Sequence, residues 1–470
     1  MSIFFNEGET KKRPGVYKRY ENIGTDARSS SRDGICAIPV QANWGPLGKV
    51  LKNTSEKSLI KNYGDGTYGN GYTVPAAAAM FKGGASTVYT YRMGTGGKAA
   101  SLELGDGLTV TAKYVGALAI SVSIAEKLGD ATKKELKVYA GNALKETFTF
   151  DANKTSEGAS LIAAASASEY VTITGNAAIV PATAVASGAL TGGENPTVAN
   201  TDYSTAFAAF ETYYYNTIAL DVDDDENLSK SLLLQAYLEN AYKHGKLGMG
   251  VVGEKTTVAF DTRCNHAKAF NDEKIVYLGG GYKAGTESKD GVFAICYAAG
   301  AIAATPSNQG ITHLVVNGAT ELCESLTYEQ YEKAIESGML MLSMSPEGLI
   351  WFDSSINTLV TPGENQDEGW KKIRRVKVRF EIFDRIDRVL EPKVGRVSAD
   401  TNGIADCVQT GQRELDAMVK EGKLMSGPVF MEDPDNPYNG DSAWFIVQAD
   451  DIDSLERIYL NYQFRYSQQA

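Results

Sequence analysis

Alternating apolar and polar side chains near the carboxyl end predict one long β-strand over Leu455 to Tyr466. Its apolar face consists of Ile458, Leu460, Tyr462, Phe464 and Tyr466, and its polar face of Arg457, Asn461, Gln463 and Arg465. A second, short strand near the amino end is predicted for Val16, Tyr17, Lys18, Arg19 and Tyr20. Strands at chain ends can pair with their own domain or with a neighbouring molecule, because backbone hydrogen bonds do not depend on which chain supplies the strand. Composition alone favours pairing within the domain.

The segment after the amino-terminal strand predicts a strand, a helix and another strand. Gly34 to Val40 reads as a buried strand. Pro75 to Met80 begins an alanine-rich helix that ends at Gly83 and Gly84, and Thr87 to Arg92 returns as a strand. This order predicts a compact βαβ-like block.

Between Gly94 and Pro196 the composition shifts to Ala, Thr, Ser and Gly, and glycine-rich stretches bracket the segment. Alternating runs predict strands at Leu108 to Val115, Ala119 to Ala125, Leu136 to Ala140, Thr147 to Phe150 and Tyr170 to Thr174. A segment of about 100 residues with its own strands and flexible borders predicts a domain inserted into another one.

From Tyr213 to Val316 strands alternate with helical stretches, which is typical of a parallel or mixed α/β sheet. The predicted strands are Thr217 to Val222, Gly248 to Val252, Ile275 to Leu278 and His313 to Val316. The apolar stretch Val292 to Ala304 is shorter than the roughly 20 residues of a membrane-spanning helix, so it predicts a buried helix.

The carboxyl-terminal part predicts two helices followed by strands. One helix covers Asp367 to Leu390, and the other covers Ile404 to Leu424. The apolar stripe of the first helix consists of Trp370, Ile373, Val376, Phe380, Phe383 and Leu390. Strands are predicted at Ala443 to Ala449 and at Leu455 to Tyr466.

These elements predict an α+β multidomain protein. An α/β mixed-sheet core carries an inserted β-rich domain and extended amino- and carboxyl-terminal strand arms, in keeping with a length of 470 residues. The predicted divisions are an arm (1–20), the first part of the core (21–96), the inserted domain (97–196), an α/β middle domain (197–365), a carboxyl-terminal domain (366–454) and a second arm (455–470).

Composition excludes several classes of function. A net charge of -12 and a pI near 5.0 argue against direct nucleic-acid binding, which depends on Lys and Arg at phosphates. Five scattered cysteines predict reduced thiols in a protein made in a cytosol. The amino terminus does not resemble a signal peptide, which disfavours a surface-layer or adhesin-like protein.

Candidate catalytic and ligand sites are weak. Gly279 to Ala284 matches a dinucleotide-binding pattern, but no helix is predicted directly after it. Asp221 to Asp225 opens like a calcium loop, yet Glu226 stands where glycine is needed. Cys264 and His266 point to different faces of a helix, so they do not form a nucleophile and base pair. We predict no catalytic, cofactor or metal site.

Several blocks of sequence resemble contractile phage-tail sheath proteins. They are RPGVY (Arg13 to Tyr17), GICAIPVQANWGPLGKV (Gly34 to Val50), AAAAMFKGGASTVYTYRM (Ala76 to Met93), KKIRRVKVRFEIFDRIDRVLEPKVG (Lys371 to Gly395) and LERIYLNYQFRY (Leu455 to Tyr466). The resemblance implies a structural subunit, not an enzyme, in a phage virion tail or a phage-tail-like bacteriocin particle. The particle is assembled in the bacterial host cytoplasm.

The resemblance also implies how such a subunit acts. Copies form hexameric rings, stack helically around an inner tail tube protein, and meet baseplate and tail terminator proteins. The sheath contracts from a metastable extended state and drives the tube through a bacterial envelope. No cofactor, direct nucleic-acid contact or membrane insertion is implied.

The two arms of this family add strands to a neighbour's carboxyl-terminal sheet. The matching positions here are Val16, Tyr17, Lys18, Arg19, Tyr20, Ile458, Leu460, Tyr462, Phe464 and Tyr466. The Ile404 to Leu424 helix lies where the family has its tube-facing helix, which makes Arg413, Lys420 and Lys423 candidate tube contacts, although a solvated helix face explains them equally well. The alternative function is an α/β enzyme with a β-rich accessory domain and a small ligand near Tyr277 to Gly285.

Overall fold

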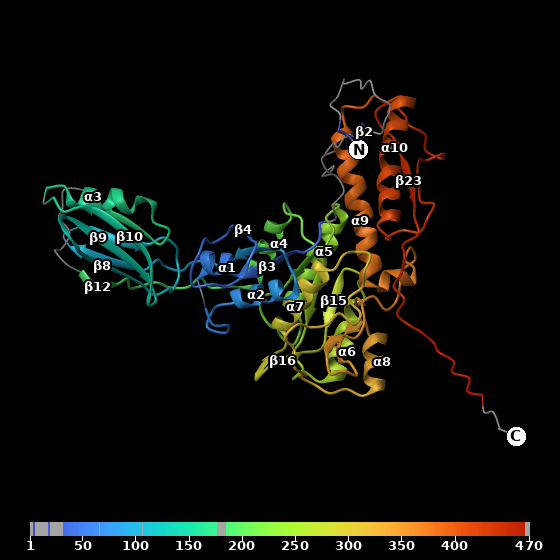
Figure 1. Ribbon diagram of the computed structural model, residues 1–470, viewed down its shortest axis with the longest axis horizontal. Helices are drawn as coiled ribbons and strands as arrows, with labels where there is room; N and C mark the ends of the chain where they lie inside the picture. Colours follow the sequence, from blue (N-terminus) through green and yellow to red (C-terminus); the bar gives the residue numbers. More distant parts are fainter. Residues whose placement is uncertain are drawn as a thin grey trace. The chain divides into compact units, whose positions relative to one another are not determined.

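The computed structural model describes residues 3–4, 17–18, 32–64, 66–105, 107–153, 155–175 and 185–465 (Figure 1). The chain forms two compact units, Met1–Ser31 and Arg32–Ala470. In the first unit, β1 (Ile3–Phe4) and β2 (Tyr17–Lys18) pair in parallel. The predicted arm residues Val16, Arg19, Tyr20 and Tyr466 lie outside the described residues.

A seven-stranded sheet forms the centre of the second unit. Its strands run in the order β19, β15, β14, β13, β3, β5, β4, and all neighbours are parallel except β4, which is antiparallel to β5. The strands are β3 (Ile35–Val40), β4 (Val50–Asn53), β5 (Thr87–Arg92), β13 (Thr217–Ala219), β14 (Met249–Gly253), β15 (Ile275–Leu278) and β19 (Met339–Leu340). Central strands such as β14 and β15 are buried on both faces, as parallel strands covered by helices are. The predicted mixed α/β sheet is confirmed.

Helices cover both faces of this sheet. They are α1 (Glu56–Tyr63), α2 (Val74–Gly83), α4 (Asn200–Phe210), α5 (Ser229–Lys243), α6 (Phe260–Phe270), α7 (Val292–Ala304) and α8 (Tyr328–Glu336). Helices α1, α2 and α7 share one apolar cluster, and α4, α5, α6 and α8 share another. The backbones of α2 and α7 touch, since a Cβ on Gly83 would lie 2.1 Å from the carbonyl oxygen of Tyr297. Helix α7 has its predicted bounds, and no described helix is long and apolar enough to cross a membrane.

Residues 101–189 form two antiparallel sheets around a separate apolar cluster. One sheet has the order β10, β9, β8, β12 and the other β11, β7, β6. The elements are β6 (Ser101–Gly105), β7 (Leu108–Ala112), β8 (Ile120–Lys127), β9 (Asp130–Ala140), β10 (Ala143–Asp151), α3 (Glu157–Ala164), η1 (Ala165–Ala167), β11 (Val171–Gly175) and β12 (Val185–Ala189). The five predicted strands of this β-rich region are present; β6, β12 and α3 were not predicted. The domain boundaries stay predictions.

Two side chains tie the β-rich region to the central sheet. The ring of Trp44, which follows β3, stacks on Tyr170 at 5.5 Å and meets Tyr114 edge-on at 5.0 Å. Arg92 at the end of β5 is fully buried and donates to the carbonyl oxygens of Ala42 and Val115 at 2.8 and 2.9 Å. Burial lowers the pKa of Arg92 to about 10.

The carboxyl-terminal part consists of two helices and a two-stranded sheet. Its elements are η2 (Glu368–Lys371), α9 (Ile373–Leu390), η3 (Glu391–Lys393), α10 (Thr401–Lys420), β22 (Val429–Glu432) and β23 (Phe445–Gln448). Side chains of α9, α10 and both strands form one apolar cluster. The ring of Phe430 packs against Gly411 of α10 so closely that a Cβ there would lie 2.6 Å from it.

Smaller antiparallel sheets join β17, β16 and β18, and β20 and β21. Their bounds are β16 (Tyr282–Ala284), β17 (Glu287–Lys289), β18 (Glu321–Leu322), β20 (Leu342–Met344) and β21 (Ile350–Phe352).

Three predictions are wrong in detail. His313 to Val316 is not a strand of the central sheet; His313 has a φ of 59°, which breaks an extended backbone, and β19 holds the edge instead. The helix predicted from Asp367 begins at Ile373, because Lys372 is extended with a φ of -107°. Phe383 is 41% exposed, because the buried faces of α9 lie on either side of it.

An ammonium on α9 closes the end of α7. Lys377 donates to the carbonyl oxygen of Ile302 at 2.7 Å and to that of Thr305. Burial of this ammonium lowers its pKa to about 8, although Asp33 and Glu381 oppose the shift. Free carbonyls at a helix end favour a cation, which explains its position.

This shift predicts a stability gain at high pH. The unfolded lysine has a pKa of about 10.4, so between pH 8 and that value the unfolded chain binds a proton that the folded chain lacks. The free energy of unfolding of the wild type, relative to Lys377→Met, therefore rises by on the order of 1–3 kcal/mol between pH 7 and pH 10. Urea unfolding of both proteins at several pH values measures it, and parallel pH curves contradict it.

Candidate functional site

The last described segment, residues 452–465, leaves the body of the protein without strand pairing. An isolated bridge joins Leu424 to Asp451, and beyond it no described residue forms a β-ladder with this segment. Its large side chains face solvent, and Phe464 is 92% exposed. The other exposed ones are Leu455, Ile458, Tyr459, Leu460 and Tyr462. Within residues 455–465 the predicted strand is therefore absent from the single chain, because a strand needs a second backbone to pair with.

The root of this carboxyl-terminal arm (residues 455–470) is held by backbone hydrogen bonds and a buried carboxylate. The amide of Ile452 donates to the carbonyl oxygen of Lys423 at 3.0 Å. Asp451 accepts two hydrogen bonds from Arg375, at 2.5 and 2.9 Å, and one from Arg379 at 3.2 Å. Burial raises the pKa of Asp451, but these two guanidinium groups outweigh it and hold the pKa below its usual value.

Further contacts join Lys and Arg side chains to polar side chains of the root. Lys372 pairs with Asp453 at 2.7 Å and with Glu456 at 3.1 Å, and Arg374 donates to the hydroxyl of Ser454 at 3.0 Å. Lys372, directly before α9, and Arg374, Arg375 and Arg379 in the first turns of α9 surround an acidic chain segment. We call these four residues the basic clamp. The run of Lys and Arg from 371 to 379 and the acidic run 450–456 are visible in the sequence, but their contact was not predicted.

The sheet of β22 and β23 offers edges to an added strand. The two strands pair antiparallel, with Phe430 opposite Val447 and Glu432 opposite Phe445, so these four side chains share one face. Phe430 is buried on α10, whereas Val447 is 40% exposed. Within the described residues no third strand covers either edge. Uncovered edges of this kind are templates for strand addition.

The three basic residues predicted to face a tube differ in position. Arg413 and Lys420 lie on α10 with exposed side chains. Lys423 follows the helix, which ends at Lys420 rather than at Leu424, and its side chain is 5% exposed. Lys423 pairs with Glu381 at 2.8 Å and with Glu421 at 2.6 Å. It belongs to the interior, so only Arg413 and Lys420 remain candidate surface contacts.

The residues weighed for catalysis and metal binding have structural roles. Asp221 is buried and accepts from the hydroxyls of Thr73 at 2.5 Å and Tyr203 at 2.7 Å, and burial raises its pKa. Asp223 accepts from the first amide of α7. His266 contacts Glu254 at 2.7 Å, and Cys264 is buried. Among the described residues no group of three His, Cys, Asp or Glu side chains could hold a metal ion.

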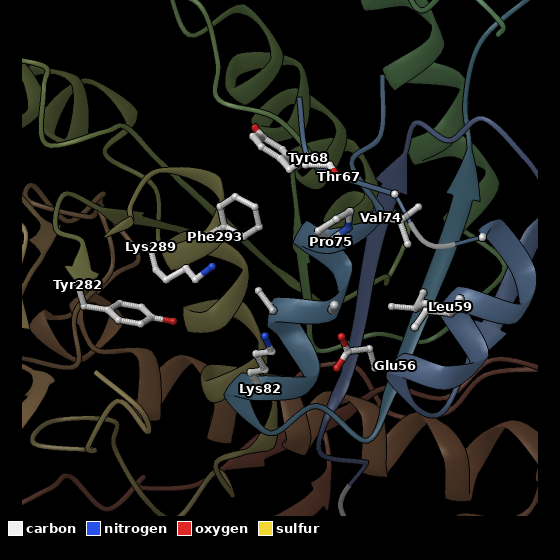
Figure 2. Close-up of a pocket in the computed structure, with 15 residues that line it drawn as sticks. Glu56, Leu59, Thr67, Tyr68, Val74, Pro75, Lys82, Tyr282, Lys289 and Phe293 are labelled. Carbon is white, nitrogen blue, oxygen red and sulfur yellow. The ribbon is translucent and has the colours of Figure 1, made fainter. Parts of the chain in front are cut away.

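A cavity of about 420 Å³ lies between α1, α2 and the start of α7 (Figure 2). Its apolar wall includes Leu59, Val74, Pro75 and Phe293, and Figure 2 shows Lys82, Lys289 and Glu56 among its charged side chains. The ammonium of Lys289 lies 5.2 Å from the ring of Phe293 and pairs with Glu287. The described lining residues include no His or Cys.

Comparisons with known proteins agree over nearly the whole chain. Residues 197–358 match the family described as the phage tail sheath protein central domain. The phage-like element PBSX protein XkdK of Bacillus subtilis strain 168 is 24% identical over 475 residues, covering 97% of this chain and 98% of that protein. The sheath tail protein of Desulfitobacterium hafniense has a TM-score of 0.70 at 20% identity, covering 93% of this chain and 100% of that chain.

A solved assembly is similar as well. The helical sheath of the anti-feeding prophage in its contracted state has a TM-score of 0.55 at 11% identity, over 97% of this chain and 99% of that chain. The resemblance to tail sheath proteins that the sequence blocks predict is confirmed. The family that residues 197–358 match is one of structural tail sheath proteins rather than enzymes, which disfavours the alternative α/β enzyme.

The basic clamp predicts that removal of the Asp451 carboxylate lowers the free energy of unfolding. Asp451→Asn leaves Arg375 and Arg379 without their buried partner, and the free energy of unfolding falls by about 1–3 kcal/mol. Asp453→Asn is the control, because Asp453 is 37% exposed and its pair with Lys372 is worth at most about 1 kcal/mol. Urea unfolding and hydrogen exchange at the Ile452 amide measure both effects. Equal effects of the two substitutions contradict the clamp.

Proposed function

We propose that this chain, a member of the phage tail sheath protein family, is the subunit of a contractile sheath that polymerises by lending its carboxyl-terminal arm to a neighbour. The observation that carries this proposal is the arm itself. It has the alternation of a strand, its apolar side chains face water, and it has no strand partner among the described residues. Pairing with another copy satisfies its backbone and removes its apolar face from water.

Addition of the arm of one copy to the sheet of another gives an open assembly. The arm and the accepting sheet are different surfaces of the same chain, so each contact is heterologous and leaves both surfaces free at the ends of the chain of copies. The resemblance to tail sheath proteins implies hexameric rings that stack helically, and two such links for each subunit, one through each arm, would connect the copies. The amino-terminal arm around Tyr17 and Lys18 supplies the second link, in exchange for its pairing with β1.

Contraction follows from rigid bodies joined by flexible links. The extended sheath is a metastable state held by kinetics, and subunits rotate as rigid bodies while the arms keep them connected. The root of the carboxyl-terminal arm is a hinge, because the chain changes there from a clamped segment to one without strand pairing among the described residues. The rearrangement drives the inner tube through a bacterial envelope and needs no nucleotide.

The remaining partners follow from the place of the subunit in a virion tail or phage-tail-like particle. Helix α10 faces the inner tail tube, and the exposed cations of Arg413 and Lys420 contact acidic groups on it. Baseplate and tail terminator proteins cover the two ends of the sheath. A basic pair at the rim of an interface acts mainly on the rate of association and its salt dependence.

The proposed strand exchange predicts that proline in the arm prevents assembly. Tyr462→Pro removes one backbone donor from the shared ladder, whereas Tyr462→Thr keeps it along with a strand-forming side chain. Both variants keep the free energy of unfolding of the wild-type monomer within about 0.5 kcal/mol, because Tyr462 is 72% exposed. Size-exclusion chromatography and electron microscopy show sleeves for Tyr462→Thr and monomers for Tyr462→Pro. Normal sleeves of the proline variant contradict arm exchange.

The proposed contact between α10 and the tube predicts that tube binding can be lost without loss of sheath polymerisation. Arg413→Glu combined with Lys420→Glu leaves sheath polymerisation intact and lowers the association rate with tubes by about tenfold or more, most strongly at low salt. Lys145→Glu on β10 is a matched control, since it also reverses an exposed charge. Co-sedimentation of sheath with purified tubes measures the effect, and unchanged binding by the double variant removes α10 as the tube-facing element.

A further inference from the structure

A cleft with both polar and apolar walls lies where the β-rich region meets the helices beside the central sheet. Its volume is about 570 Å³. The loop after β3, the end of α1 and the loop before α2 line it on one side, and the segment before β8 and the turn between β9 and β10 line it on the other. Pockets that hold small molecules have volumes of roughly 300–1,000 Å³. We call this space the junction cleft.

One buried acceptor in the junction cleft has no partner. Asn43 is 5% exposed, and its amide nitrogen donates to the hydroxyl of Tyr72. The amide oxygen Oδ1 of Asn43 accepts no hydrogen bond from any described residue. A buried acceptor without a donor costs free energy, so an orphaned oxygen at the wall of a cleft points to a bound group that donates to it.

Asn43 and Tyr72 together present an acceptor beside a donor. The hydroxyl of Tyr72 accepts from Asn43, so that bond leaves its own proton unused. A hydroxyl group or a secondary amide fits such a pair, because each can donate one hydrogen bond and accept another. The amide of Asn142 and the ammonium of Lys145 add further hydrogen-bonding groups to the lining.

The remaining lining selects the class of ligand. Ile60 and Leu118 supply aliphatic surface, and the ring of Tyr170 is held in place by stacking on Trp44 at 5.5 Å. No described lining residue is Asp or Glu, which disfavours a cation. A sugar matches these walls, because its ring has apolar C–H faces and its edges carry hydroxyl groups.

We propose that the junction cleft binds a neutral saccharide, and that one hydroxyl or acetamido group of the sugar donates to Asn43 and accepts from Tyr72. Bound water satisfies the same two groups but leaves the apolar walls wet, whereas a sugar ring covers them as well. This inference goes beyond the proposed function and is independent of arm exchange, because a single copy supplies the whole lining.

Two disaccharides test the proposal by equilibrium dialysis against the full-length protein. Cellobiose offers hydroxyl groups alone, and N,N′-diacetylchitobiose has the same linkage with an acetamido group on each ring. The difference in affinity between them tells whether Asn43 and Tyr72 bind a hydroxyl or an amide. We expect a dissociation constant on the order of 1 mM or tighter for the preferred sugar.

Two exposed alanines of the same sheet provide matched variants. Ala143 on β10 lines the junction cleft, whereas Ala131 on β9 does not. Ala143→Phe fills the cleft and raises the dissociation constant about tenfold or more, and Ala131→Phe keeps it within about twofold of the wild-type value. Tyr72→Phe removes the hydroxyl but keeps the ring, and raises the dissociation constant about fivefold or more. Circular dichroism verifies that each variant is folded.

Failure of both disaccharides to bind overturns the saccharide site, and so does equal binding by Ala143→Phe and the wild type. Loss of sheath assembly in Ala143→Phe but not in Ala131→Phe also overturns it, because the cleft is then a contact between copies. A protein that binds a disaccharide but forms no sheath keeps this site and contradicts the proposed strand exchange.

Discussion

The charges on α9 are the interaction on which the rest of the structure depends. One face of the helix packs Ile373, Val376 and Phe380 into the cluster under the central sheet, and another packs Val378 and Ile382 against α10. Between these faces, Arg385 pairs with Glu381 at 2.7 Å and with Glu421 at 2.6 Å, and Lys423 pairs with the same two carboxylates. Such buried networks need every partner, because an unpaired buried charge is costly. Helix α9 thereby contacts the body, the arm root and the carboxyl-terminal sheet, and holds the three together.

This arrangement explains how a stable monomer can carry an unsatisfied arm. The body buries its own apolar surface in several clusters, and none of these clusters includes a side chain of the described arm. The arm beyond Glu456 makes no strand pairing in the described chain. In the proposed strand exchange, the arm becomes ordered only when a neighbour supplies an edge. In that exchange, ordering of the arm costs conformational entropy, which weakens its contact with the neighbour. The cost is limited because the arm is short and its root is held by the basic clamp.

Much of the fold follows from local sequence, and the exceptions have physical reasons. Strands β5 and β15 and helix α7 have the predicted bounds, because each is a buried run next to a glycine or proline that marks its end in the sequence. The two-residue β19 carries too little pattern to be recognised, and α9 hides two buried faces behind one apparent stripe. The basic clamp joins Arg375 to Asp451 across 76 positions, and no local pattern reports a contact over that distance. The burial of Lys423 depends in the same way on Glu381.

The attachment of the β-rich region has a mechanical consequence. Arg92 binds carbonyl oxygens on both sides of the junction, and Trp44 is inserted between aromatic rings of the β-rich cluster. Gly116 lies so close to Asn43 that a Cβ there would be 1.9 Å from its carbonyl oxygen. A joint of this kind resists twisting, so torque applied to the β-rich region passes directly into β3 and β5. A load on that region would therefore be carried into the central sheet rather than absorbed by bending at the junction.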